Sequence, residues 1–229
     1  MRIKLMMGRA RLFFVAVFIS FAPALVRAQE APPQPITPSV LSSAYGDKLK
    51  IRGVPNPGRI NDHLYRGAQP SEQGLEELKK LGITTIIDLR AEGRSKAEWE
   101  KQEVEKLGMH FVHIPIAAFA APTNEEVVQF LSLLRSDPQQ RIFVHCLLGE
   151  DRTGVFIATY RMSEQKWPVA QAMREMNDFG FNGFWHPAMK SFIRDFPARL
   201  SSAPAFAALQ SPKSPVAIVT NPAAVPKAN

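Results

Sequence analysis

The sequence predicts a single α/β domain with a mostly parallel central sheet flanked by helices. Between about residues 60 and 200, runs of strand length that are rich in β-branched residues alternate with amphipathic stretches of helix length. The run ITTIIDL at 83–89 is nearly continuous in β-branched residues, as expected for a strand that is buried on both faces. Because strand–helix–strand units usually join parallel neighbours, this alternation favours a parallel sheet with helices packed on it.

The predicted strands are short runs of β-branched and aromatic residues. They are HLYRG at 63–67, ITTIIDL at 83–89, HFVHIPI at 110–116 and RIFVH at 141–145. In sheets of this kind, ligands bind at the carboxyl ends of the strands. Residues that directly follow a predicted strand are therefore the first candidates for a functional site.

The predicted helices lie between and after these strands. They span residues 72–82, 95–108 and 124–136, then about 152–165, 168–179 and 186–199. Ser71 can cap the first helix, which ends at Gly82, and Thr123 with Glu126 forms a capping box for the third. The aromatic run FGFNGFWH at 179–186 joins the last two helices and is expected to lie in the core.

The first 28 residues have the pattern of a secretory signal peptide. A basic segment at 2–11 precedes the apolar run LFFVAVFISFAPAL at 12–25, and VRA at 26–28 offers small residues for cleavage. We expect the cleaved protein to be exported, either to the periplasm or out of the cell. The alternative is an uncleaved membrane tether, but the apolar run contains Pro23 and falls short of the roughly 20 residues that a spanning helix needs.

The remaining chain divides into three parts by composition. Residues 29–43 are rich in Pro and Ser and are predicted to form a linker. Residues 44–200 have the size of one domain and contain all the predicted strands and helices. Residues 201–229 are rich in Ala, Pro and Ser, show no periodic apolar face and are predicted to be a disordered tail.

The basic charge of the chain comes largely from its N-terminus. The net charge is +7 for the whole chain and falls to +2 without the first 28 residues, which carry five basic groups and no acid. A nucleic-acid-binding domain needs a basic stripe on its folded surface, and the sequence indicates none. We therefore expect no nucleic-acid partner and, after signal cleavage, no stable membrane span.

The only cysteine, Cys146, directly follows the predicted strand 141–145, within RIFVHCLLGEDRTG. A lone cysteine is often a small buried hydrophobe, and it cannot form an internal disulfide. Here, however, five residues separate Cys146 from Arg152, near which a helix is predicted to begin. A strand, a short loop and a helix N-terminus direct successive backbone N–H groups at one point, which is an arrangement that binds phosphate. The planar guanidinium of Arg152 can hold two phosphate oxygens at once.

The same electrostatic field favours a thiolate at Cys146. A free cysteine titrates at a pH of about 8.5, and a helix N-terminus beside an arginine can lower this to roughly 4–7. We expect Cys146 to be ionised at neutral pH and able to attack phosphorus.

The segment HCLLGEDRTG resembles the His-Cys-(five residues)-Arg-Thr/Ser signature loop of the cysteine-based protein tyrosine and dual-specificity phosphatases. The resemblance extends upstream through NDHLYRGAQPSEQGLEELKKLGITTIIDLR and covers roughly residues 60–196. It implies hydrolysis of phosphate monoesters through a cysteinyl-phosphate intermediate, without a metal or another cofactor. The implied substrate is a phosphorylated protein or a small phosphoester.

The resemblance also implies a role for each residue of the loop. Cys146 would accept the phosphoryl group, and Thr153 would hydrogen-bond Cys146 and help it to leave when water attacks. Arg152 and the backbone N–H groups of 147–152 would stabilise the phosphate oxygens. His145 is expected to orient the loop from below. The residues implied to contact substrate are Leu147, Leu148, Gly149, Glu150, Asp151 and Arg152.

The proton donor departs from the common pattern of this family. Most dual-specificity phosphatases place an Asp on the loop after the third strand, and here that loop, PIAAFAAPTNEE at 115–126, contains none. Asp151, directly before Arg152, is the first alternative, and in this respect the loop is similar to that of the myotubularin lipid phosphatases. A carboxyl group at the pocket mouth could deliver the proton. Asp88 is the second alternative, although an ion pair with Arg90 or a loop arginine is the favoured interpretation of this residue.

Other functions stay open at the level of sequence. The in-loop Asp151 motivates a lipid or inositol phosphate phosphatase as the alternative function. A catalytically inactive phosphate-binding module is disfavoured, because Cys146, Arg152 and Thr153 are all present. His110 and His113 lie three apart on one predicted strand and face opposite ways, which argues against a shared metal.

Overall fold

The computed structural model describes residues 45–210. The predicted signal peptide, the predicted linker and residues 211–229 of the predicted tail lie outside the described residues.

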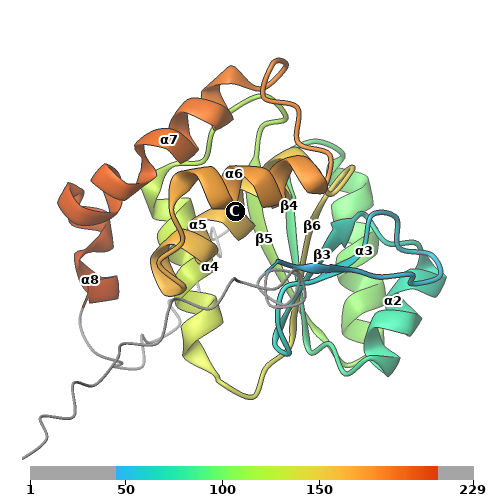
Figure 1. The fold of residues 1–229 in the computed structure, drawn as a ribbon. Helices are drawn as coiled ribbons and strands as arrows, with labels where there is room; N and C mark the ends of the chain where they lie inside the picture. Colours follow the sequence, from blue (N-terminus) through green and yellow to red (C-terminus); the bar gives the residue numbers. More distant parts are fainter. Residues whose placement is uncertain (1–44, 211–229) are drawn as a thin grey trace, which may run out of the picture. The chain divides into compact units, whose positions relative to one another are not determined.

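The described residues form one six-stranded sheet in the order β1-β2-β3-β6-β4-β5. Figure 1 shows its four longer strands in the order β3, β6, β4, β5. The strands are β1 (Asp47–Lys48), β2 (Gly58–Arg59), β3 (Leu64–Ala68), β4 (Thr85–Arg90), β5 (His110–Ile116) and β6 (Ile142–Cys146). The four longer strands run parallel to one another, and β1 and β2 add a short antiparallel edge. The sheet is therefore mixed and mostly parallel, which confirms the predicted fold class.

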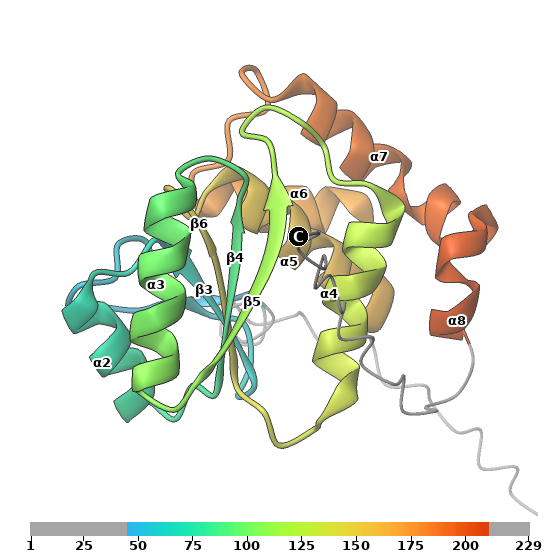
Figure 2. The ribbon, with the colours of Figure 1, turned by 180° about the vertical axis from the view of Figure 1, so that it is seen from behind.

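Helices cover both faces of this sheet. They are α2 (Glu72–Lys80), α3 (Arg94–Lys106), α4 (Asn124–Ser136), α5 (Asp151–Glu164), α6 (Val169–Asp178), α7 (Pro187–Ser202) and α8 (Ala207–Gln210), with the 3-10 turn η1 (Pro204–Phe206) before α8. Figures 1 and 2 show α2 and α3 on one face and α4, α5, α6 and α7 on the other. Each face has its own apolar core, so β4 and β6 are buried on both sides.

The four predicted strands and six predicted helices are confirmed, with ends that shift by no more than about three residues. Ser71 accepts a hydrogen bond from the backbone N–H of Gly74, and the capping box of Thr123 and Glu126 forms in full. The strands β1 and β2 were not predicted, because two residues are too few to show a periodic pattern.

The folded chain continues beyond residue 200, where the sequence predicted the domain to end. α7 runs to Ser202, and η1 and α8 follow it and pack against α4. Phe206 is fully buried and Leu209 nearly so. Two apolar side chains in an Ala- and Pro-rich stretch give no helical periodicity, so the sequence predicted disorder where residues 201–210 are in fact folded.

The aromatic segment 179–186 also differs from the prediction. Phe179 and Phe181 are buried as expected, but Phe184 and Trp185 are 82% and 64% exposed. The segment is therefore half core and half surface. Within the described residues, no helix is long and apolar enough to cross a bilayer.

Candidate active site

Cys146 is the last residue of β6, the strand that lies between β3 and β4 in the sheet. It is 3% exposed and pairs in register with Ala68 of β3. Residues 147–150 connect Cys146 to α5, which begins at Asp151. The structure thus places Cys146 at the carboxyl edge of a parallel sheet, directly below a helix N-terminus, as the sequence predicted.

The loop after Cys146 presents a series of unpaired backbone N–H groups. Among residues 45–210, no acceptor pairs with the backbone N–H of Leu147, Leu148, Gly149 or Glu150. The first N–H groups of α5 are also free, because the first bond of the helix runs from Gly154 to the carbonyl of Glu150. Together these donors form a cradle of the kind that binds an anion at a helix N-terminus.

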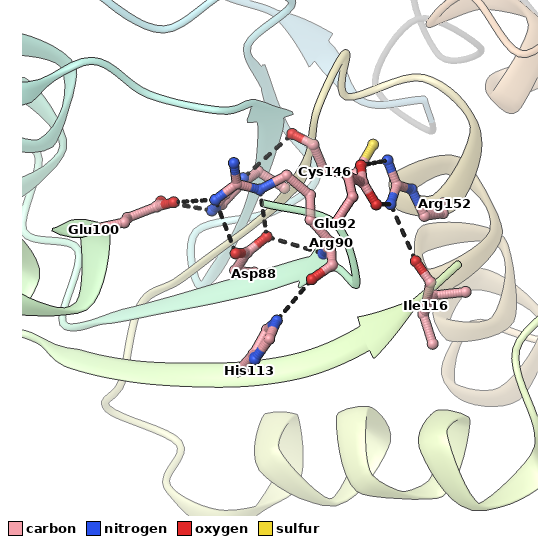
Figure 3. Close-up of polar contacts among 9 residues, drawn as sticks. Asp88, Arg90, Glu92, Glu100, His113, Ile116, Cys146 and Arg152 are labelled. Atoms are coloured by element: carbon pink, nitrogen blue, oxygen red, sulfur yellow. Dashed lines mark hydrogen bonds and ion pairs between the residues drawn. The ribbon is translucent and has the colours of Figure 1, made fainter. Parts of the chain in front are cut away.

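The guanidinium of Arg152 is the charged part of this cradle. It is 5% exposed and donates from Nη1 and Nη2 to the two carboxylate oxygens of Glu92, at 2.7 Å each. Nη1 also donates to the carbonyl of Ile116 at 3.0 Å. Figure 3 shows Glu92 and Arg152 face to face beside the sulfur of Cys146. In this structure Arg152 therefore binds the carboxylate of Glu92 in the two-pronged way in which a guanidinium also binds phosphate.

This ion pair changes the pKa of both partners. Burial lowers the pKa of Arg152, but Glu92 and the neighbouring Cys146 outweigh this effect and raise it overall. The Arg152 guanidinium in turn lowers the pKa of Glu92, against a smaller opposing effect of burial. Both groups are charged at neutral pH.

Asp151, the first alternative for the proton donor, contacts the segment before α7. Its Oδ2 lies 3.1 Å from Nε2 of His186, and its Oδ1 accepts a hydrogen bond from the backbone N–H of Asn182 at 3.3 Å. The ring of Phe119 stacks on His186, with centroids 5.2 Å apart. Phe119 comes from the loop in which most dual-specificity phosphatases carry an Asp. In this chain the loop at 115–126 therefore supplies an aromatic ring that packs on His186, the partner of Asp151.

The other predicted loop residues differ in exposure. Leu147 and Leu148 are 46% and 56% exposed and form an apolar part of the rim. Burial, followed by the charge of Asp151, raises the pKa of Glu150. Thr153 is fully buried, and its hydroxyl has no hydrogen-bond partner in the described part of the chain. The bond from Thr153 to Cys146 implied by the resemblance is not made in this structure.

A buried charge network lies beneath Cys146. Nε2 of His145 lies 2.7 Å from Oε1 of Glu100, and Nδ1 faces the carbonyl of Cys146 at 3.3 Å. Arg90 bridges the other oxygen of Glu100 to both oxygens of Asp88, with distances of 2.6 to 2.9 Å (Figure 3). All four side chains are at most 2% exposed.

This network decides between the roles considered for Asp88. Its carboxylate is fully buried and paired with Arg90, so the predicted ion pair is confirmed and Asp88 is not available at the pocket mouth. Burial alone would lower the pKa of His145, but Glu100 and then Asp88 outweigh this effect and raise it. His145 supports the loop from below and is not exposed to substrate.

Three residues of the site were not singled out from sequence. Glu92 and Glu100 come from the segment after β4 and from α3, and His186 precedes α7. The position of Glu92 just past a strand end was the one available signal, because the site lies at that edge of the sheet. Among the described residues, no group of three or more His, Cys, Asp or Glu side chains could hold a metal ion.

Comparison with known protein families identifies the domain. A family model described as a DSP-PTPase phosphatase fused to NAD+ kinase matches residues 56–194. The chain belongs to this DSP-PTPase phosphatase family. The matched range contains the signature loop, Glu92, Asp151 and His186.

Two relatives illustrate the range of this family. The chain is 29% identical over 131 residues to the dual specificity protein phosphatase TpbA of Pseudomonas aeruginosa, and the match covers 54% of each chain. It is 37% identical over 87 residues to mouse protein tyrosine phosphatase type IVA 2, covering 36% of this chain and 49% of the relative. The chain therefore spans only about half the length of these curated relatives.

Solved structures confirm the fold of this DSP-PTPase member. The crystal structure of P. aeruginosa TpbA superposes with a TM-score of 0.57 and 24% identity, over 67% of this chain and 91% of TpbA. A second TpbA structure is a complex with pTyr. The catalytic domain of the yeast PP-IP phosphatase SIW14 superposes with a TM-score of 0.52 and 19% identity, over 63% of this chain and 86% of SIW14.

Proposed function

We propose that this DSP-PTPase protein hydrolyses phosphate monoesters through a cysteinyl-phosphate intermediate. The observation that carries the proposal is the position of Cys146 below free backbone N–H groups and beside Arg152. Family membership and the similarity to TpbA, a dual specificity protein phosphatase, support it.

In the first step, the Cys146 thiolate attacks phosphorus and the bond between phosphorus and the ester oxygen breaks. The equatorial oxygens are stabilised by the loop N–H groups and by Arg152, whose Nε–H and second Nη2–H remain available beside Glu92 and Ile116. The departing oxygen takes a proton from Asp151, which is the carboxyl group on the loop itself.

In the second step, water attacks the cysteinyl phosphate and the S–P bond breaks, which releases inorganic phosphate. Asp151, now a carboxylate, accepts the proton of that water. The hydroxyl of Thr153 is buried and has no partner among the described residues, so it is free to donate to the sulfur as the sulfur leaves. The contacts of Asp151 with His186 and with the Asn182 N–H hold its carboxyl group in place through both steps.

We propose an aryl phosphate, and phosphotyrosine in particular, as the substrate class. The rim around the loop carries exposed apolar side chains that suit an aromatic leaving group. They are Leu147, Leu148, Phe119, Phe184 and Trp185. The complex of the related TpbA with pTyr supports this choice. A lipid or inositol phosphate remains the second candidate, which the in-loop Asp151 and the shared fold of the PP-IP phosphatase SIW14 favour.

The test is a panel of phosphorylated substrates assayed with residues 29–210, wild type and Cys146→Ser, in the presence of EDTA. We expect phosphotyrosine peptides to be hydrolysed faster than phosphoserine peptides or inositol phosphates, and Cys146→Ser to be inactive. Turnover that survives Cys146→Ser, or that requires added zinc, would exclude the mechanism. Faster hydrolysis of inositol phosphates would reassign the substrate.

Asp151 is tested by its dependence on the leaving group. Asp151→Asn should slow phosphotyrosine by roughly 10²–10⁴-fold, but an activated aryl phosphate much less, because that leaving group needs little protonation. Asp88→Asn serves as the matched control and should affect all substrates alike, through stability. The opposite pattern would assign the proton to Asp88.

We also propose that the protein is exported and acts in the periplasm or outside the cell, on the basis of the pattern in residues 1–28. N-terminal sequencing of the protein recovered from fractionated cells tests this. A mature N-terminus after residue 28 is expected, whereas an intact N-terminus in the membrane fraction would indicate a tether.

A further inference from the structure

Arg66 lies at the centre of β3 and has no part in the mechanism above, yet it contacts the phosphate loop. Its side chain is fully buried, and its Nη2 donates to the carbonyl of Gly149. Its Nε and Nη1 have no hydrogen-bond partner among the described residues. The guanidinium stacks on the ring of Phe179, with Cζ 4.1 Å from the centroid.

No carboxylate within the described residues forms an ion pair with Arg66. The carboxylate that acts most strongly on Arg66, Glu175 of α6, is already held by Arg161 of α5, through bonds of 2.9 and 2.6 Å. Glu175 also accepts from the backbone N–H of Gly46. Arg66, Arg161 and Glu175 are each at most 2% exposed, so this buried group carries a net charge of +1.

A buried charge without a partner is costly, and the pKa of Arg66 reflects this. Burial lowers the pKa to about 10, and the charges that oppose this effect are Glu175, Cys146 and Glu150. Arg66 is therefore still a cation at neutral pH. Since Glu175 is neutralised by Arg161, the negative charges left to oppose the charge of Arg66 are those of Cys146 and Glu150, which both belong to the signature loop.

The contact with Gly149 also fixes the direction of a peptide in the cradle. The same carbonyl lies 3.3 Å from the side-chain amide of Asn56, so two donors hold it. In a trans peptide the C=O and the following N–H point in opposite directions. With its carbonyl turned toward Arg66, the Gly149–Glu150 peptide directs the N–H of Glu150 away from Arg66, and this N–H is one of the free donors of the loop.

We propose that Arg66 is a positioning residue of the phosphate site. It holds the Gly149–Glu150 peptide in its anion-binding orientation, and it supplies a buried positive charge that the Cys146 thiolate or a bound phosphate dianion balances. The inference deepens the proposed function and rests on it. In this arrangement Arg152 contacts the bound phosphate directly. Arg66 acts on the phosphate through the position of the loop and through the electrostatic field of its own charge.

The experiment measures the ionisation of Cys146 and the binding of inorganic phosphate, neither of which requires turnover. Because the chain has one cysteine, iodoacetamide labels a single site, and the rate can be followed by mass spectrometry across pH. Arg66→Met removes the charge and the donor. Asn56→Gly is the control for the loop contacts without the charge, because it removes the amide that donates to the carbonyls of Leu148, Gly149 and Phe179 and leaves the charge unchanged. Glycine accepts the φ of +47° found at this position.

We expect Arg66→Met to move the pH of half-maximal alkylation of Cys146 upward by about one unit. Inorganic phosphate should also protect Cys146 from alkylation about tenfold less well. Both effects are of the size expected when one nearby charge is removed from a partly solvated interior. Asn56→Gly should change both by less than about threefold, and Arg66→Lys should restore most of the pH shift. If Arg66→Met does not fold, Arg66→Gln carries the same expectation. A folded neutral variant with the alkylation profile and phosphate protection of the wild type would overturn the inference. Lack of phosphate protection in the wild type would instead exclude the proposed function.

Discussion

Gly149 offers a sharp test of the phosphate cradle, because its backbone conformation and its surroundings both exclude a side chain. Its φ is +70°, where an L-residue costs about 1–2 kcal/mol. A Cβ at this position would lie 2.4 Å from the carbonyl carbon and oxygen of Gly67 and 2.5 Å from the backbone N of Ala68. Gly67 and Ala68 belong to β3 and pair with β6, so they cannot move without disrupting the sheet.

The expected size of the effect follows from these distances. Ordinary contacts of a Cβ begin at about 3.4 Å, so in Gly149→Ala the loop must shift by roughly 1 Å. A displacement of this size at a catalytic site can cost about 10²-fold in rate. The backbone cost of roughly 1–2 kcal/mol alone corresponds to a loss of about 2–8 °C in Tm for a domain of this size. We therefore expect kcat/KM for an aryl phosphate to fall by about 100-fold or more, while the protein stays folded at 25 °C.

Gly82→Ala is the matched control for this experiment. Gly82 has a φ of +81°, and its added Cβ would meet only the side chain of Arg141, at 3.2 Å from Nη1. The variant carries the same backbone cost without a clash against the sheet, so its Tm should fall by a similar amount with unchanged kinetics. Steady-state kinetics and thermal melts of both variants are compared. Near-wild-type kcat/KM in Gly149→Ala, or an equal loss in Gly82→Ala, would refute the argument that the cradle depends on close packing against β3.

Three further predictions concern the charged groups of the site. Arg152→Lys should lower kcat/KM by at least about 100-fold with little change in Tm, since a point charge cannot replace the planar fork; unchanged kinetics would show that Arg152 does not bind the phosphate. Glu92→Gln should lower the inhibition constant of inorganic phosphate several-fold, because a neutral amide no longer competes for Arg152 or repels the phosphate dianion. Weaker inhibition by phosphate would instead show that Glu92 holds the Arg152 guanidinium in place. The raised pKa of His145 means that its ion pair with Glu100 stabilises the fold fully below about pH 6.5 and is lost as the pH rises through the pKa in the folded state. The Tm should accordingly fall as the pH rises above about 6.5, and a slope that persists in His145→Gln would locate the titration elsewhere.

The fold was predictable because local and long-range signals agree in this chain. The continuous apolar runs of β4 and β6 and the caps at Ser71 and Thr123 each point to the same α/β arrangement. The short strands β1 and β2 and the helical segment 204–210 escaped prediction for a common reason. Their stability comes from contacts with distant parts of the sheet and of α4, and such contacts leave no local pattern.

The site was predictable where its residues are consecutive and not where they converge from separate elements. Cys146, the loop and Arg152 form one motif whose chemistry can be derived from spacing alone. The partners Glu92 and His186 come from other segments, and their pairing depends on the tertiary structure. Arg66 belongs to a short strand whose sequence indicates an ordinary alternation of side chains, so its burial without an ion pair is visible only in the structure.

The single cysteine also bears on how the protein responds to oxidation. A thiolate is the form that peroxide attacks, and the resulting sulfenic acid is commonly protected by forming a disulfide with a second cysteine of the same chain. This chain contains only Cys146, so that internal route is absent. Reactivation after a first oxidation must come from a thiol outside the chain. In the exported location that we propose, the supply of such a thiol would set how long Cys146 stays in its reduced form.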